Sequence, residues 1–401
     1  MRSPSCRPPG LCSFLFLMAA CGPSLTNAQI VLRATTILDG RGGILKDQQI
    51  AIEGSKIQSV KPSSGAATYD LRGLTVMPGW IDAHVHLDSH FNSQHKLVDA
   101  EGPPQTVALD AAENAWRTLQ AGFTTVQSVG AEIDGPLRDR IASGALPGPR
   151  VLTSLRPVTE KSGSPEAIRE FVRKLKADRA DVVKLFATSG SAGGGGQTMS
   201  DAQIQAACGE AKKVGLRAVV HALTSPASKV AALAGCTSIE HGDFLDNETL
   251  ALMAQHGTYL DPNFLVLYNY LDDRASFDFT PSHFDELAKS TKIIGDTLRR
   301  AHEHKVIVLF GTDAVAGAHG RNAEEFIYRV RDAHEPAMET LKSATSISAG
   351  SLGLGDRIGT IAPGYEADLV ATDGNPLEDI TAVRRVVFVM KGGKVFKNVH
   401  R

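Results

Sequence analysis

The stretch Gly79-Trp80-Ile81-Asp82-Ala83-His84-Val85-His86 is a short apolar run that ends in two histidines separated by one residue. Alternation along a β-strand places His84 and His86 on the same face of the strand, close together. Histidine is the commonest neutral nitrogen ligand of metal ions, so this pair forms half of a candidate metal site. A chance pair of this kind is not rare among 13 histidines in 401 residues, and His302-Glu303-His304 is another, predicted on a solvated helix face. The metal-site interpretation therefore depends on partners elsewhere in the chain.

Seven further apolar segments alternate with helical patterns, which is typical of a parallel sheet covered by helices. Most of them are continuously apolar, as expected for strands buried on both faces. The predicted strands are Trp80–His86, Phe123–Val129, Arg150–Leu155, Val182–Ala187, Leu216–Ala222, Thr237–Gly242, Thr258–Phe264 and Val306–Asp313. Eight strands with intervening helices predict an α/β fold of the (β/α)8 TIM-barrel type. A doubly wound open sheet is the alternative, and counting strands does not exclude it.

Two of the intervening helices have clear start signals. Ser164-Pro165 precedes an apolar stripe of helical spacing, with proline at the first helical position. Ser200 and Gln203 have the spacing of a capping box before a second helix. Both signals predict helices between neighbouring strands.

Both ends of the chain have the pattern of a small antiparallel β unit, from Ile30 to Val76 and from Ala367 to Phe396. Neither end holds enough apolar surface for a core of its own. We therefore expect the two ends to complete one β domain, with the middle of the chain inserted into it. The predicted division is an export signal at 1–28, a composite β domain at 29–78 plus 360–401, and a catalytic barrel at 79–359.

The first 28 residues have the pattern of an export signal. Arg2 and Arg7 precede an apolar core, Leu11–Ala20, that is too short to span a bilayer. Cleavage after Ala28 is the favoured interpretation. The alternative is that Met18–Cys21 resembles an imperfect lipobox, which predicts a lipid anchor on Cys21. Either interpretation predicts an exported protein, periplasmic or secreted, without a membrane span.

The composition narrows the range of functions. A net charge of −2 and the absence of a basic run argue against nucleic-acid binding. A hydrophobic content of 42% with 21% charged residues is ordinary for a globular protein. Cys208 and Cys236 are the only cysteines after the leader, so the sequence allows one disulfide there. The sequence leaves open whether the chain forms a homo-oligomer.

Polar side chains occur at or near the carboxyl ends of four later strands. Lys184 lies inside an apolar run, where a buried ammonium is costly unless it is paired or neutralised. The plain interpretation of such a lysine is snorkelling or a structural ion pair. The plain interpretation of a lone histidine is a core residue whose ring nitrogens are hydrogen-bonded. Several independently placed residues on one rim favour a shared site instead. The candidate metal ligands are His84, His86, Lys184, His221, His241 and Asp313.

This ligand set resembles the binuclear metal pattern of the amidohydrolase superfamily. The resemblance covers nearly all of the chain after the leader and includes Val76–His86 and Gly364–Val370. It implies one metal ion on His84, His86 and Asp313 and a second on His221 and His241. It further implies that carboxylated Lys184 and a hydroxide bridge the two divalent ions. Zinc is the expected metal, although nitrogen and oxygen ligands also suit manganese, cobalt or nickel.

The resemblance implies hydrolysis of an amide, a lactam or a related carbonyl compound. The two ions would activate the bridging water and polarise the carbonyl, and Asp313 would carry its proton to the leaving amine. We take Asp313 and His241 as the catalytic residues. Ala121–Val126, Pro147–Leu152 and Ile239–Gly242 are similar to the prolidase-like and imidazolonepropionase-like branch, which includes ochratoxin-hydrolysing amidases.

The prolidase-like members of this branch release an amino acid whose carboxylate is free, so a cationic or phenolic group is expected to bind that carboxylate. Loop packing is the alternative for the two candidate tyrosines, and a plain surface charge is the alternative for Arg321. The loop after strand three, Leu155–Gly163, lacks a histidine that many relatives use to contact the substrate. The candidate substrate-binding residues are Tyr268, Tyr270, Arg156, His319 and Arg321.

Three functional hypotheses follow. The leading one is a metal-dependent amidohydrolase that cleaves the amide bond between an acyl or aminoacyl group and a C-terminal amino acid, ochratoxin-type compounds included. The second is a hydrolase of cyclic amides or lactones, as in imidazolonepropionases. The third is an exported binding protein whose metal site has lapsed, and the intact set of six ligands argues against it.

Overall fold

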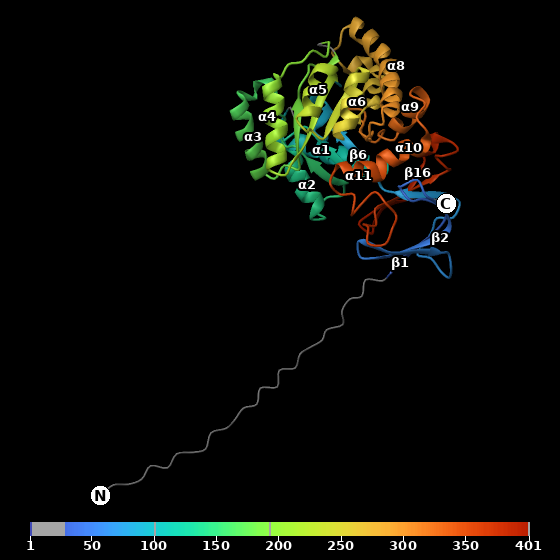
Figure 1. Ribbon diagram of the computed structural model, residues 1–401. Helices are drawn as coiled ribbons and strands as arrows, with labels where there is room; N and C mark the ends of the chain where they lie inside the picture. Colours follow the sequence, from blue (N-terminus) through green and yellow to red (C-terminus); the bar gives the residue numbers. More distant parts are fainter. Residues whose placement is uncertain (2–28, 100–101, 192–193, 400–401) are drawn as a thin grey trace.

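The computed structural model describes residues 1, 29–99, 102–191 and 194–399. The predicted export signal and both of its cleavage interpretations fall on residues 2–28 and lie outside this described part. Within it the chain is an α/β protein, with helices packed around parallel strands and a mixed sheet at one end (Figure 1). The terminal sheet is mostly antiparallel, as expected, but β1 (Ile30–Leu38) pairs in parallel with β4 (Tyr69–Asp70) and β5 (Leu74–Pro78).

Seven of the predicted barrel strands are present as parallel strands in two sheets. The order within the first sheet is β10-β9-β6 and within the second β11-β12-β13-β14. The Asp181 amide donates to the Thr153 carbonyl at 2.8 Å, which joins β10 to the start of β11. The strand bounds are β6 Trp80–Val85, β9 Phe123–Ser128, β10 Arg150–Thr153, β11 Val182–Phe186, β12 Arg217–Thr224, β13 Ser238–Phe244 and β14 Tyr259–Asp261.

The eighth predicted strand, Val306–Asp313, is not a regular strand. This segment makes single parallel bridges, from Val308 to Leu260 of β14 and from Ala314 to Val85 of β6. Two local features interrupt it. A side chain at Gly311 would collide with the buried Asp261 carboxylate, and Asp313 has a left-handed backbone with φ of 50°. The segment still lies between β14 and β6, which is the order expected for a (β/α)8 barrel.

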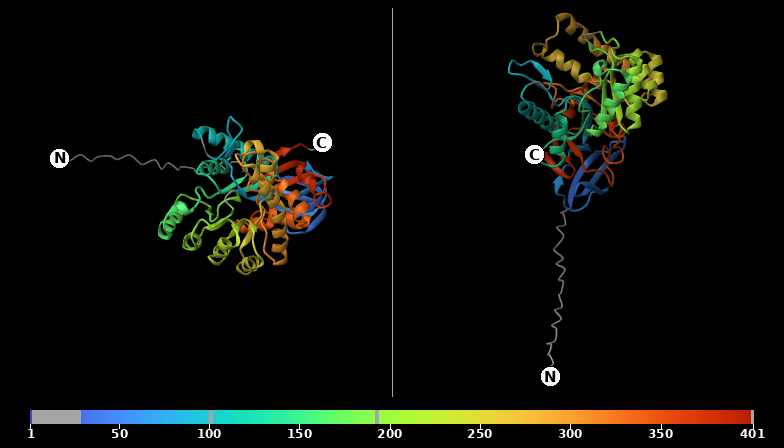
Figure 2. Two further views of the ribbon diagram at one scale, coloured as in Figure 1. Left: turned by 90° about the horizontal axis from the view of Figure 1, so that it is seen from above. Right: turned by 90° about the vertical axis from the view of Figure 1, so that its left-hand side faces the viewer.

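The helices follow the parallel strands and cover their outer side (Figure 2). Both predicted start signals are confirmed: Ser164 accepts from the Ala167 amide, and Ser200 and Gln203 form the reciprocal capping box. Among the described residues, we find no helix with the length and apolar character needed to cross a membrane. The helix bounds are α1 Pro104–Gln120, α2 Asp134–Ala142, α3 Pro165–Ala177, α4 Asp201–Lys213, α5 Ser225–Leu233, α6 Asn247–His256, α7 Phe264–Asp272, α8 Pro281–Glu303, α9 Glu324–Asp332, α10 Ala337–Lys342 and α11 Ser348–Ser351.

One sheet contains strands from both ends of the chain, in the order β17-β16-β15-β5-β1-β2-β3, with β4 paired to β1. Its junction is the antiparallel pair of β15 and β5, in which Val370 faces Met77. Figures 1 and 2 show the blue N-terminal strands beside red C-terminal segments. Exact domain boundaries stay a prediction. The bounds are β1 Ile30–Leu38, β2 Ile44–Glu53, β3 Lys56–Pro62, β4 Tyr69–Asp70, β5 Leu74–Pro78, β15 Leu369–Asp373, β16 Val386–Lys391 and β17 Lys394–Asn398.

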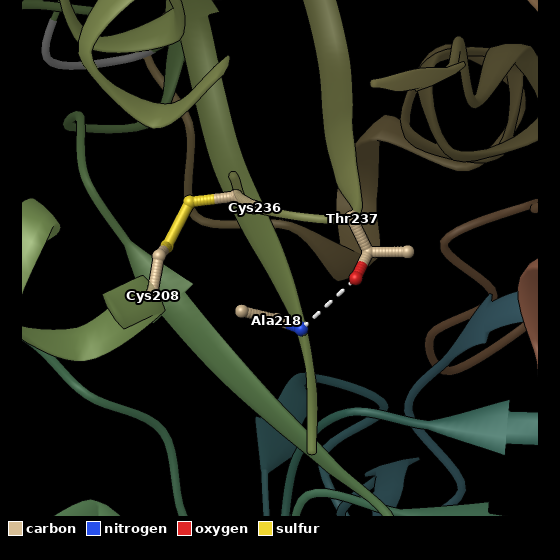
Figure 3. The surroundings of a disulfide bond; sticks show 4 residues. All are labelled: Cys208, Ala218, Cys236 and Thr237. Atoms are coloured by element: carbon tan, nitrogen blue, oxygen red, sulfur yellow. Dashed lines mark hydrogen bonds between the residues drawn. A yellow bond between two sulfur atoms is a disulfide. The ribbon is translucent and has the colours of Figure 1, made fainter. Parts of the chain in front are cut away.

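Cys208 and Cys236 form a disulfide between α4 and the segment that leads into β13 (Figure 3). Both cysteines are buried. Beside the disulfide, the Ala218 amide of β12 donates to the Thr237 hydroxyl at 3.2 Å. The disulfide thus connects the outer helix layer to the strands that carry two of the candidate ligands, His221 and His241.

Replacing both cysteines, as in Cys208→Ala/Cys236→Ala, is expected to lower the free energy of unfolding by about 3 kcal/mol. The reason is that the bond closes a loop with a sequence separation of 28 residues in the unfolded chain. Urea denaturation of the wild type, with and without a reductant, measures the same effect independently. The double variant is the control, because its midpoint should not respond to the reductant. Equal wild-type midpoints in both buffers would contradict the prediction.

Candidate functional site

Three of the predicted ligands converge on one point at the carboxyl end of β6. The Nε2 atoms of His84 and His86 lie 3.3 and 3.2 Å from Asp313 Oδ1. Two donors held about 2.1 Å from one zinc ion in a tetrahedral arrangement are about 3.4 Å apart. The spacing of His84, His86 and Asp313 therefore fits a metal ion bound between them, and their ligand atoms all lie within 4.8 Å of one another.

Lys184 of β11 points into the same place. Its Nζ lies 3.0 Å from His84 Nε2, and the side chain is fully buried, which excludes the snorkelling interpretation. Burial lowers the pKa of Lys184, while the negative charges of Glu240 and Asp313 act in the opposite direction. A lowered pKa increases the share of neutral amine, which is the form that reacts with carbon dioxide to give a carbamate.

His221 and His241 approach from β12 and β13. Their ring centroids are 4.6 Å apart, and the His241 ring lies 5.5 Å from that of His84. Burial lowers the pKa of His241 to about 3 and the pKa of His221 well below its ordinary value. Both imidazoles are therefore neutral at neutral pH, which is the form that ligates metals. The structure brings all six predicted ligands together on one rim.

Two of these ligands have an unusual backbone. His241 and Asp313 have φ angles of 70° and 50°, in the left-handed region that residues other than glycine rarely adopt. The His241 amide donates to Asn263 Oδ1 at 3.2 Å, and the Asp313 amide donates to the His84 carbonyl at 2.8 Å. Such strain persists where surrounding contacts hold it, and it is common at functional sites.

Asp82 connects β6 to the segment that carries Asp313. Its buried carboxylate accepts from the Thr312 amide at 3.1 Å, from the Thr312 hydroxyl at 2.7 Å and from Asn322 Nδ2 at 2.7 Å. Burial raises the pKa of Asp82 to about 7, although these hydrogen bonds act to lower it. The network fixes Thr312, and with it the direction of the neighbouring Asp313 side chain.

The Asp313 carboxylate is ionised at neutral pH. Burial acts to raise its pKa, but the neighbouring imidazoles of His84 and His86, the latter through a hydrogen bond, outweigh burial and hold the pKa well below its usual range. A carboxylate of this kind can ligate a metal ion or accept a proton.

Sequence reasoning missed a buried pair of acids behind His84. Glu240 Oε2 lies 2.9 Å from His84 Nδ1, and Asp261 completes a second cluster with ligand atoms within 4.8 Å of one another. Burial raises the pKa of both Glu240 and Asp261. A carboxylate placed beside Nδ1 favours the proton on that nitrogen and leaves Nε2, which faces Lys184 and Asp313, as the nitrogen that can ligate a metal. The available signal was an acid inside the apolar strand Ile239-Glu240-His241.

A cleft of about 760 Å³ opens beside the cluster. Gly130 on its wall lies against the site, since a Cβ there would be 2.9 Å from His86 Nδ1 and 2.7 Å from Asp88 Oδ1. The short hairpin of β7 (Ser89–Phe91) and β8 (Leu97–Asp99) contributes Asp99 to the lining. The charged residues of the lining are Asp88, Asp99, Glu132 and Arg156.

Three predicted substrate-binding residues lie near the cluster or the cleft. Tyr270 packs against Phe277, and the charge of Asp313 together with burial raises its pKa. His319 is buried, with Nε2 3.0 Å from the His86 carbonyl oxygen. Arg156 lines the cleft, but it already forms ion pairs with Glu132 and Asp178.

The other two predicted substrate-binding residues are engaged elsewhere. The Tyr268 hydroxyl donates to Asp332 Oδ2 at 2.6 Å, and its ring stacks on Tyr328 of α9 at 3.9 Å. Arg321 forms ion pairs with Asp272 and Glu324. Packing against α9 therefore explains Tyr268 better than substrate binding does. Ion pairing within the protein likewise explains Arg321 better than substrate binding does. The helical phase of α7, which turns Tyr268 toward α9, was not visible in the sequence.

Comparisons with known proteins identify the family of this chain. The model of the amidohydrolase family matches residues 75–396. A crystal structure of a Xaa-Pro dipeptidase with bound methionine is 31% identical, with a TM-score of 0.85 over 92% of this chain and 100% of that one. A prolidase complexed with N-methylphosphonate-L-proline is 28% identical, with a TM-score of 0.84 and the same coverage. The ochratoxinase of Aspergillus niger is 25% identical over 88% of this chain and 82% of its own. The chain therefore belongs to the amidohydrolase family, in the branch of its prolidase and ochratoxinase relatives.

Proposed function

We propose that the protein is a metal-dependent hydrolase, built on a (β/α)8 barrel, that cleaves the amide bond between an acyl or aminoacyl group and a C-terminal amino acid. The observation that carries the proposal is the convergence of His84, His86 and Asp313 beside the buried amine of Lys184. The likeness to a Xaa-Pro dipeptidase and to ochratoxinase supports this substrate class. The alternative, hydrolysis of cyclic amides or lactones, needs no group that binds a carboxylate.

The donor set suits two divalent ions. His84, His86 and Asp313 would hold one ion, His221 and His241 the other, and Lys184 as a carbamate would contact both. The fit is supported by the neutral state of His221 and His241 and by the enclosed Lys184 amine. When bound, the ions, which we propose to be zinc, would supply Lewis acidity for the scissile carbonyl and lower the pKa of a water molecule.

The chain's own groups position the substrate and move the proton. Asp313, ionised and partly buried at the site, accepts a proton from the attacking water and delivers it to the leaving nitrogen. His241 faces the same point from β13 and acts as the second catalytic residue. The Tyr270 phenol is protonated at neutral pH, and burial raises its pKa further, so it can donate a hydrogen bond to the substrate carboxylate.

The cleft discriminates between substrates by charge. Its one cation, Arg156, is paired with Glu132 of the lining and with Asp178, so Asp88 and Asp99 leave the lining with an excess of acids. Such a lining favours a substrate with a free ammonium group over a neutral acyl group. Dipeptides are therefore favoured over N-acyl amino acids within the proposed class.

We also propose that the protein is exported. The disulfide between Cys208 and Cys236 supports this proposal, because structural disulfides form and persist in oxidising compartments outside the cytosol.

A panel of substrates tests the function. Xaa-Pro and Xaa-Arg dipeptides, their N-acetyl forms, ochratoxin A and simple lactones are compared by kcat/KM with the zinc-loaded protein. We expect turnover of free dipeptides, with lower kcat/KM for the N-acetylated forms because the acidic cleft loses its ammonium partner. Turnover of the lactones alone would overturn the proposal in favour of the cyclic-substrate alternative.

The variant Lys184→Ala is expected to lose roughly three orders of magnitude in kcat and to bind fewer metal ions. The physical reason is that it removes the only side chain that would contact both ions. Addition of a short carboxylic acid such as propionate should restore part of the activity, since it supplies two oxygens in the vacated space. Elemental analysis gives the metal content. A variant with full metal content and wild-type kcat would refute the role of Lys184.

The variant Glu240→Gln should weaken metal affinity by about 10-fold to 100-fold, because His84 would lose the carboxylate that orients its Nδ1. Titration with zinc against a competing chelator measures the affinity. Glu248→Gln serves as the matched control, because Glu248 is an exposed acid paired with Lys229 on the protein surface. The role of Glu240 is disproved if both variants bind zinc as the wild type does.

A further inference from the structure

A second cavity, of about 470 Å³, lies between the connection from α2 to β10 and the hairpin of β16 and β17. We call it the basic cavity. Arg150 on its wall is the first residue of β10, whereas the candidate metal ligands lie at the opposite, carboxyl ends of the barrel strands. The basic cavity is therefore separated from the candidate active site by the length of the strands.

The charged lining of the basic cavity is entirely cationic: Arg138, Arg150, Lys391 and Lys394. The arginines have acid partners outside the lining. Arg138 pairs with Asp181 at 2.8 Å, and Arg150 pairs with the buried Asp368 at 2.8 Å. The two lysines differ from them. Within the described residues, no carboxylate oxygen lies within 4.0 Å of the amine of Lys391 or of Lys394.

Lys391 is partly buried in this basic surrounding. Its amine donates to the Gly148 carbonyl and lies 5.7 Å from the centroid of the Phe396 ring. Burial lowers the pKa of Lys391 to about 8; the positive charges of Arg150 and Lys394 act in the same direction, and the negative charge of Asp368 acts against it. An anion bound beside Lys391 and Lys394 would lessen the repulsion between their positive charges.

The remaining wall of the basic cavity is apolar and aromatic. It includes Ile141, Leu146, Pro147, Val151 and the ring of Phe396. A volume of about 470 Å³ exceeds what an inorganic anion needs, and it lies in the range of small-molecule sites. The cavity thus combines a charged end with an apolar body.

We propose that the basic cavity binds a phosphate monoester with a small apolar or aromatic body. Lys391, Lys394 and Arg150 hold the phosphate, and Phe396 and Leu146 contact the body. The two lysines without a carboxylate partner match the two negative charges of the monoester dianion. Because the lining comes from both the barrel and the terminal sheet, the bound ligand also ties these two parts together.

Isothermal titration of the full, zinc-loaded protein with phenyl phosphate tests the proposal, with inorganic phosphate and phenol as separate probes. We expect saturable binding of phenyl phosphate, weaker binding of inorganic phosphate and none of phenol. The variant Lys391→Gln/Lys394→Gln should weaken phenyl phosphate binding by roughly tenfold or more, since it removes two charge-assisted contacts. Lys46→Gln/Lys61→Gln, on exposed strands of the same sheet, is the matched control.

Phosphate esters can also bind to metal ions, so the two sites must be told apart. Phenyl phosphate binding that persists in Lys184→Ala and is lost in the lysine pair variant supports the basic cavity. Binding that is lost in Lys184→Ala and unchanged in the pair variant overturns it, as does an absence of saturable binding. Dipeptide turnover by the pair variant should equal that of the wild type, so failure here leaves the proposed hydrolase function untouched.

Discussion

The rest of the site depends on the contacts that the His84 imidazole makes. Its Nε2 lies 3.0 Å from the Lys184 amine and 3.3 Å from Asp313, and its Nδ1 lies 2.9 Å from Glu240. A buried amine, a neutral ring and several acids are stable together only when each charge has a partner. These groups come from β6, β11, β13 and the segment 306–314, so the closed arrangement of parallel segments is what brings them into contact.

The supporting residues explain why the site is held firmly. Asp82 of β6 accepts a hydrogen bond from the Thr312 hydroxyl. The Asp313 amide donates to the His84 carbonyl, and this bond holds the left-handed backbone of Asp313. The left-handed backbone at Asp313 lies where its carboxylate faces His84 and His86. The irregular eighth segment therefore coincides with the candidate site, as backbone strain often does.

Much of this arrangement was predictable from the sequence, because most of the barrel strands are apolar runs and their last residues must share one edge. The two helix caps were predictable from residues close together in the sequence. The disulfide partners were predictable because only two cysteines follow the leader in the sequence. The role of Glu240 was not, since nothing local shows which buried acid meets His84. Strand seven was predicted too long, as β14 stops at Asp261. Just after Asp261, the backbone of Asn263 is left-handed, which ends the extended strand. Helix α7 begins at once, and the Glu325 carboxylate accepts from the Leu265 amide in its first turn.

The pairing of β15 with β5 has a consequence for how the molecule is made. Strand β5 runs directly into β6 through Gly79, whereas its partner β15 follows the whole barrel in the chain and is synthesised after it. Until then, one edge of β5 offers unpaired amides and carbonyls to any extended chain. A molecule that lacks β15 would keep this strand edge unpaired, so truncation before Leu369 is expected to favour aggregation.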